Sequence, residues 1–210
     1  MKQRRLGQYT AELHQQDYWL TAAPLGSENR NSLRGKNMLA YLFIVLAVAI
    51  RLLPHAWHLT PLGAALLFFG AKRPVREWIA PLALLASTDI YLTTVHYRMH
   101  VSVDHLVTWA WYVVAMGIGC LLVRKADPSR VVGASLASAI SFFLISNFAT
   151  WLFQDLYAKT FAGLVQCYTM AIPFFRGTIA SDLIYTPVLF SVPYALSLIE
   201  RKMAEARVRG

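Results

Sequence analysis

Long apolar segments separated by short basic loops are the feature of this sequence that most limits the folds open to it. Each apolar segment is close to the about 20 residues that a helix needs to cross a bilayer, and they lie at residues 37–53, 54–71, 78–95, 106–123, 131–153 and 178–199. Only helices and closed barrels pair all their backbone polar groups in hydrocarbon. We therefore expect an all-α fold, an integral membrane bundle of six transmembrane helices. The apolar part of segment 54–71 is short, which leaves open a tilted span, a broken span or a re-entrant helix beginning at Pro61.

The composition supports a membrane protein with one domain. Only 15% of the residues are charged, whereas soluble domains carry about 25%. The 210 residues provide one bundle and no second soluble domain. We expect a basic cytoplasmic N-terminal tail at residues 1–36, a six-helix membrane domain at 37–200 and a basic cytoplasmic tail at 201–210.

The positions of the basic residues predict the topology. If the N-terminus is cytoplasmic, the tails and inner loops contain all 20 Lys and Arg residues except Arg51, Arg98, Lys159 and Arg176. Such an excess of cationic residues on one side is the positive-inside pattern. We therefore expect a multi-pass protein of the inner (cytoplasmic) membrane with both termini in the cytoplasm. The net charge of +9 then reflects topology, and we expect no nucleic-acid partner.

Polar residues converge toward the outer half of the expected bundle. Counting about 1.5 Å per residue along each span places Arg51, Asp89, Asn147 and Asp182 there. Ionisable residues within spans are rare and usually mark a cavity or a partner. The inner half has almost no ionisable residue, which disfavours a self-contained channel or pump. We expect a pocket open to the outside.

The stretch from residue 161 to 185 combines apolar residues with a Pro-Phe-Phe-Arg-Gly sequence and Asp182. We expect a short interfacial helix at residues 161–172, a break, and then the last span. This break would form the floor or lid of the polar pocket. The expected ligand-binding residues are Arg51, His58, Asp89, Asn147, Trp151, Tyr168, Phe174, Phe175, Arg176 and Asp182.

Structural roles compete with binding for these polar residues. Asn147 could bridge helices, and Asp182 could belong to the N-terminal cap region of the last helix. An ion pair of Asp89 with Arg51, or of Asp182 with Arg176, would explain either carboxylate without a ligand. For Asp89 alone we favour a polar cavity, because it lies deeper in its span.

Other chemistry has little support in the sequence. The histidines lack a metal-binding spacing such as HExxH, and Cys167 has no adjacent base for nucleophilic catalysis. We expect no metal, no cofactor and no catalytic residue, and an enzyme is the less favoured class. The phosphate-binding sequence GxxxxGK[ST] is absent, so the chain alone cannot energise transport with ATP.

Two parts of the chain, residues 59–91 and 145–185, resemble an uncharacterised family of bacterial membrane proteins, a domain of unknown function. The resemblance rests on a Thr-Pro pair before a short helix, a Ser and Asp, an Asn-Phe with Trp, a Gly-Leu-x-x-Cys-Tyr run, Pro-Phe-Phe, and Asp-Leu-x-Tyr. These fall on Thr60, Pro61, Ser87, Asp89, Asn147, Phe148, Trp151, Gly163, Leu164, Cys167, Tyr168, Pro173, Phe174, Phe175, Asp182, Leu183 and Tyr185. Thr88 departs from the pattern by separating Ser87 from Asp89, and His58-Leu59 stands where Asn-Phe is usual.

That family is in turn similar in size and layout to the S-components of energy-coupling-factor vitamin transporters. The similarity implies six helices, an outward-facing small-molecule site, and energy from a separate transmembrane subunit with ATPases. The Ala-x-x-x-Ala pattern that S-components often carry in their first helix is absent here. We expect a small-molecule-binding membrane protein, the substrate-specificity subunit of a vitamin or micronutrient importer. The alternatives are a membrane-embedded enzyme that uses Asp89 and Asp182 as acid and base, and a structural scaffold subunit.

Overall fold

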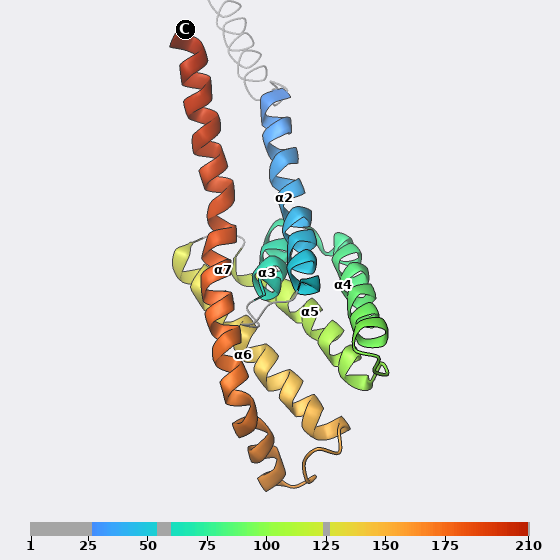
Figure 1. The fold of residues 1–210 in the computed structure, drawn as a ribbon. Coiled ribbons are helices and arrows are strands. Elements are labelled where there is room, and N and C mark those ends of the chain that lie inside the picture. Colours follow the sequence, from blue (N-terminus) through green and yellow to red (C-terminus); the bar gives the residue numbers. More distant parts are fainter. Residues whose placement is uncertain (1–26, 54–59, 124–126, 210) are drawn as a thin grey trace, which may run out of the picture. The chain divides into compact units, whose positions relative to one another are not determined.

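The computed structural model describes residues 27–53, 60–123 and 127–209, and these residues are helical with short connections. The expected all-α fold is confirmed, whereas His58 and most of the N-terminal tail lie outside the described residues. The chain divides into two units, Met1–Lys36 and Asn37–Gly210. The elements, drawn in Figure 1, are α2 (Ser27–Leu52), α3 (Leu62–Lys72), η1 (Val75–Glu77), α4 (Ile79–Tyr91), the π-helix η2 (Leu92–His96), α5 (Val103–Leu122), α6 (Pro128–Phe153) and α7 (Phe161–Arg209).

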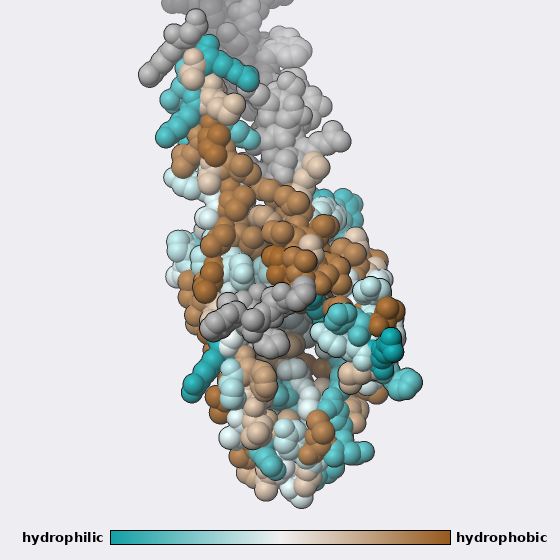
Figure 2. Space-filling view, viewed as in Figure 1, coloured by the Kyte–Doolittle hydropathy of each residue, from teal (hydrophilic) through white to brown (hydrophobic). Residues whose placement is uncertain are grey.

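Four stretches of helix are long and apolar enough to cross a membrane: Val75–His96, Val103–Leu122, Pro128–Phe153 and Phe161–Arg207. Two apolar helices are shorter, Met38–Leu52 and Leu62–Lys72. Large apolar side chains also face outward from the bundle, as Ile79 and Leu121 do with exposures of 73% and 79%. On the face seen in Figure 2, apolar surface covers the middle of α7, and hydrophilic residues follow toward its C-terminal end. Several helices thus have the character expected of a membrane protein.

Helix α3 is the centre of the bundle although it has only 11 residues. Every residue from Gly63 to Gly70 is buried, and the helix packs against α5, α6 and α7. Phe68 also packs its ring edge-on against Phe43 of α2, with the ring centroids 4.9 Å apart. At about 1.5 Å per residue, α3 is about half as long as the hydrocarbon core is thick. The segment expected at residues 54–71 therefore contains a half-length helix that begins directly after Pro61.

Two glycines allow α3 and α5 to approach closely. A Cβ atom at Gly70 would overlap the backbone carbonyl of Met116, and one at Gly119 would overlap that of Leu67. Small residues at such positions let membrane helices approach until their backbones touch. In lipid this packing replaces the hydrophobic effect as the main force that holds helices together. The α3–α5 contact thus depends on residues without side chains.

The expected break after residue 172 is wrong. Helix α7 runs without interruption through Pro173, Pro187 and Pro193 for 49 residues. Proline sets a φ value that suits a helix and removes only one backbone donor. In membrane helices neighbouring groups compensate for the lost hydrogen bond, so Pro-Phe-Phe-Arg-Gly does not end the helix. No separate interfacial helix forms at residues 161–172, and Asp182 lies within α7 instead of in the cap region of a new helix.

Candidate functional site

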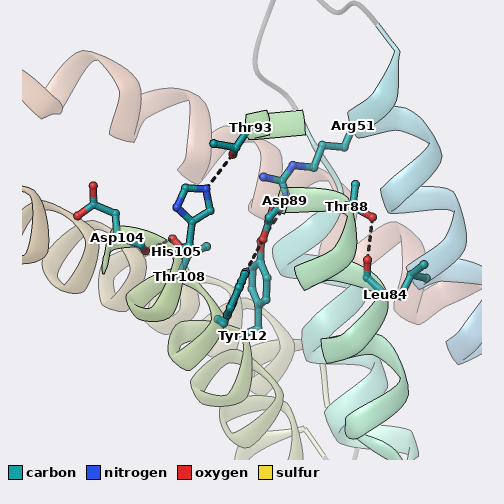
Figure 3. Close-up of polar contacts among 10 residues, drawn as sticks. Arg51, Leu84, Thr88, Asp89, Thr93, Asp104, His105, Thr108 and Tyr112 are labelled. Atoms are coloured by element: carbon teal, nitrogen blue, oxygen red, sulfur yellow. Dashed lines mark hydrogen bonds and ion pairs between the residues drawn. The ribbon is translucent and has the colours of Figure 1, made fainter. Parts of the chain in front are cut away.

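A buried ion pair joins the C-terminal end of α2 to α4. Arg51 lies in the last turn of α2, and its Nη1 atom is 2.5 Å from Asp89 Oδ1. Asp89 Oδ2 accepts hydrogen bonds from Trp109 Nε1 and from the Tyr112 hydroxyl, both at 2.9 Å. Arg51 also donates to the Tyr112 hydroxyl at 3.1 Å. Figure 3 shows Arg51 and Tyr112 pointing toward Asp89 from two different helices.

This network matches the structural explanation for Asp89 that the sequence left open. The Asp89 residue is only 4% exposed, and both of its carboxylate oxygens have partners. Breaking such a buried pair by removing one partner costs about 3–5 kcal/mol, whereas the intact pair contributes little net stability. The network therefore fixes α2, α4 and α5 against one another.

A π-helical segment follows α4 directly and begins three residues after Asp89. The segment η2 covers Leu92–His96, and π-helical turns occur often at functional sites. Thr93 Oγ1 and His105 Nε2 lie 2.8 Å apart, which ties η2 to the start of α5. The Thr93–His105 contact is thus a second polar link to α5, about one helical turn away from the hydrogen bonds that Asp89 accepts from that helix.

A cavity of about 230 Å³ lies beside this network. Its wall is formed by residues from α2, from the start of α3, and from α5, α6 and α7. The lining residues are Arg51, Thr60, Leu62, Gly63, Thr108, Trp111, Tyr112, Phe142, Thr178, Ser181 and Asp182. The cavity therefore contains two residues expected at the site, Arg51 and Asp182, and Asp89 touches it only through Arg51 and Tyr112.

Asp182 differs from Asp89 because it has no partner among the described residues. The residue is 3% exposed, and no hydrogen bond or ion pair to its carboxylate exists in the described part of the chain. The alternative of an ion pair with Arg176 is not found, and Arg176 is exposed. An unpaired carboxylate in a dry interior is costly. Asp182 is therefore the group in the cavity whose charge the described protein leaves uncompensated.

The Asp182 carboxylate lies against the first turn of α3. A Cβ atom at Gly63 would be only 2.9 Å from Oδ2 of Asp182. Helix α3 begins after Pro61 without a side-chain cap, so its first N–H groups are free of intrahelical partners. A helix N-terminus carries a partial positive charge of about 0.5 elementary charges, which partly offsets the carboxylate.

Three hydroxyl groups complete the polar wall, and each donates its proton to a backbone carbonyl. Ser181 donates to Thr60 at 2.6 Å, Thr108 to Asp104 at 2.9 Å, and Thr178 to Phe174 at 3.4 Å. A hydroxyl that donates in this way keeps its lone pairs as acceptors. These three hydroxyls therefore offer acceptors to a molecule in the cavity, whereas Arg51, which also lines it, offers N–H donors.

Three expected site residues instead form contacts near α6 and α7. Asn147 Nδ2 donates to the Phe143 carbonyl at 2.7 Å, one turn earlier in α6. Trp151 Nε1 donates to the Ala158 carbonyl at 2.9 Å. The Tyr168 hydroxyl donates to the Leu144 carbonyl at 2.8 Å. None of the three lines the cavity, and each has a structural partner.

The expected aromatic lid is also displaced from the cavity. Phe174 is 71% exposed, and Phe175 stacks on Phe143 with ring centroids 4.3 Å apart. Because α7 continues as a helix, these side chains and Arg176 lie about two turns before Asp182, and none of them lines the cavity. His58 belongs to the segment outside the described residues.

The sequence did contain a signal for the residues that were missed on α5. Thr108 and Tyr112 are four residues apart, and with His105 and Trp109 they form a polar stripe at spacings i, i+3, i+4 and i+7. Such a stripe marks one helix face. Gly63 and Ser181 gave no signal of their own.

No group of three or more His, Cys, Asp or Glu side chains in the described residues could bind a metal ion. Comparisons with known proteins gave no match to a curated protein and none to a solved structure. One family matches residues 31–206, and this range contains every residue that lines the cavity. The chain therefore belongs to DUF6580, a family of unknown function.

Proposed function

We propose that this protein binds a small solute in the cavity and is the substrate-binding subunit of an importer for a vitamin or another micronutrient. The observation that carries the proposal is the buried carboxylate of Asp182, which lines a cavity and has no partner in the described residues. A scaffold would pair such a group, as the chain does with Asp89 and Arg51. Leaving one carboxylate unpaired beside a cavity is understandable if a ligand supplies its partner.

The cavity has the mixture of surfaces that small-molecule sites use. Leu62, Trp111 and Phe142 give it apolar and aromatic walls, and the hydroxyls and Asp182 give it a few polar anchors. This combination is typical of ligand pockets, where polar groups fix the orientation and apolar walls provide contact area. The volume of about 230 Å³ is below the range of about 300–1,000 Å³ common for drug-sized ligands, so we infer a small solute.

The half-length helix α3 supports a site near the middle of the membrane. In the proposed topology six apolar segments cross or enter the inner membrane, both termini are cytoplasmic, and Lys72 at the end of α3 lies on the inner side. Eleven residues then bring the N-terminus of α3 to about the bilayer midplane. Transporters often place substrate sites at the ends of such discontinuous helices.

The proposed role includes a separate energy source. The chain lacks the ATP-binding sequence GxxxxGK[ST], so it cannot energise transport with ATP alone. A coupling transmembrane subunit with ATPases would supply the energy, in analogy to the S-components of bacterial energy-coupling-factor transporters. The match to a family of unknown function leaves this analogy as a proposal at the level of layout.

Binding agrees better with the geometry than catalysis by the two aspartates. Acid–base catalysis requires each group to reach the reacting atom within hydrogen-bond distance. Asp89 does not line the cavity, and its oxygens are engaged by Arg51, Trp109 and Tyr112. We therefore assign Asp89 a structural role that holds Arg51 and Tyr112 in the cavity wall.

Native mass spectrometry of protein gently extracted from its host membrane tests the proposal. We expect a near-stoichiometric small molecule that is not a lipid, and we expect Thr178→Phe to lose it because the new ring fills the cavity. Thr169→Phe is the matched control, since Thr169 is an exposed threonine of α7 whose hydroxyl bonds the carbonyl one turn earlier, as that of Thr178 does. If only lipids are released from all three proteins, solute binding is refuted.

A further inference from the structure

We propose that the solute carries a protonated amine and that the carboxylate of Asp182 binds it, an inference that rests on the proposed function. The charges around the cavity favour a cation. Arg51 is neutralised by Asp89 at 2.5 Å, whereas Asp182 has no partner in the described part of the chain. The N-terminus of α3 contributes only about half a positive charge. Among the described residues of the wall, the carboxylate of Asp182 is therefore the charge that a cation would pair with.

The hydrogen-bonding capacity of the wall points the same way. The protons of the Thr108, Thr178 and Ser181 hydroxyls are used on backbone carbonyls. The Tyr112 hydroxyl donates to Asp89 and accepts from Arg51. Apart from the unused guanidinium N–H groups of Arg51 and the Thr60 hydroxyl, the remaining capacity is in lone pairs, which need a ligand with N–H or O–H donors. An ammonium group provides three such donors, as the lysine side chain does.

The aromatic wall distinguishes an organic cation from an inorganic one. Trp111 lines the cavity with Leu62 and Phe142, and these groups offer an apolar surface to the carbon part of a solute. Tryptophan is also the best aromatic partner for an organic cation near its ring face. A bare sodium or potassium ion would need several oxygen ligands and would leave the apolar wall without a contact. We therefore infer a small organic ammonium compound.

An anionic solute fits less well. The carboxylate of Asp182 lies against Gly63 at the first turn of α3, so it occupies the position where an anion would use the free N–H groups. An anion would have to lie beside a buried carboxylate, and like charges in a dry site repel strongly. The guanidinium of Arg51 is already paired with Asp89.

The test uses thermal unfolding of the full chain in nanodiscs with small probes of matched size. Methylammonium and ethanolammonium are the cationic probes, 1-propanol is the neutral counterpart of ethanolammonium, and glycolate is the anionic one. Sodium and potassium chloride are tested separately. A ligand that binds the folded state raises the unfolding midpoint, because it stabilises that state by RT ln(1 + [L]/Kd). We expect a rise with at least one ammonium probe and none with 1-propanol, glycolate or either salt.

Two variants assign any such rise to Asp182. Asp182→Asn keeps the size and removes the charge, and a bond to a charged group contributes about 1.5–3 kcal/mol, so we expect about tenfold weaker binding or more. Asp155→Asn is the matched control, because Asp155 is an exposed loop residue paired only loosely with Lys159 at 3.9 Å. If Asp182→Asn does not fold, the comparison of ethanolammonium with 1-propanol in the unaltered protein still decides.

The outcomes separate this inference from the proposed function. Four results would each overturn the amine assignment. They are stabilisation by glycolate or 1-propanol, an effect of the salts equal to that of the ammonium probes, no effect of any ammonium probe, and equal binding by Asp182→Asn. In each of these cases a solute that is lost in Thr178→Phe would leave the proposed function standing. Absence of any bound solute would refute the proposed function itself.

Discussion

Replacing Arg51 by methionine should destabilise the bundle, because it leaves the buried carboxylate of Asp89 without its cation. Methionine keeps much of the length of the arginine stem, so the change removes mainly the charge and its hydrogen bonds. Asp89 is 4% exposed, and the Arg51 side chain is 27% exposed. Removing one partner of a buried pair costs about 3–5 kcal/mol, and the partial exposure of Arg51 places the expected loss of unfolding free energy at about 3 kcal/mol.

A double-mutant cycle with Asp89→Asn measures the coupling between the two residues. The free energy of unfolding in micelles is measured for both single variants and for the double variant. With the carboxylate removed, loss of Arg51 has no uncompensated charge to leave behind, so the double variant should be at least about 1 kcal/mol more stable than additivity predicts. Additive losses, or a loss below about 1 kcal/mol in Arg51→Met alone, would refute the interpretation of this ion pair.

Further predictions concern the packing of α3 and the continuity of α7. Gly70→Ala should destabilise the protein by about 1–3 kcal/mol, because the added methyl group overlaps the Met116 carbonyl. Gly133→Ala on α6 is the control: its methyl group meets no atom within 4 Å, so the change should be neutral or slightly stabilising. Thermal unfolding of both variants checks this, and equal losses of stability would contradict it. Spin labels at Val165 and Ala180, both exposed on α7, should give a backbone separation of about 22 Å by pulsed electron resonance, as a continuous helix requires. A clearly shorter distance would show that the helix is broken between the two labels.

The sequence was sufficient for the all-α fold class and for the proximity of three polar residues. Apolar segment length predicted the helices, and Pro61 indicated where α3 begins. Counting residues along each span placed Arg51, Asp89 and Asp182 at similar depth, and the structure brings them to one region. This agreement follows from the fixed rise of a helix, which converts position in the sequence into distance along the axis.

The direction in which each side chain points could not be predicted in the same way. Asn147 shares the expected depth, yet it faces its own helix backbone, and Phe175 stacks on Phe143. Which helix face meets which neighbour depends on packing between helices, and most spans here are apolar on all sides, so hydropathy alone does not orient them. The error at Pro173 has another cause, because proline breaks helices in water more readily than in a membrane bundle.

Cryo-electron microscopy tests the central claim most directly. The protein is isolated from its host membrane without added ligand, and its structure is determined with a bound antibody fragment. The account predicts density for a small molecule in the cavity, with a polar atom within hydrogen-bond distance of the Asp182 carboxylate and with Arg51 still paired to Asp89. A cavity filled by a protein side chain that pairs Asp182, or a solute bound elsewhere in the bundle, would contradict it.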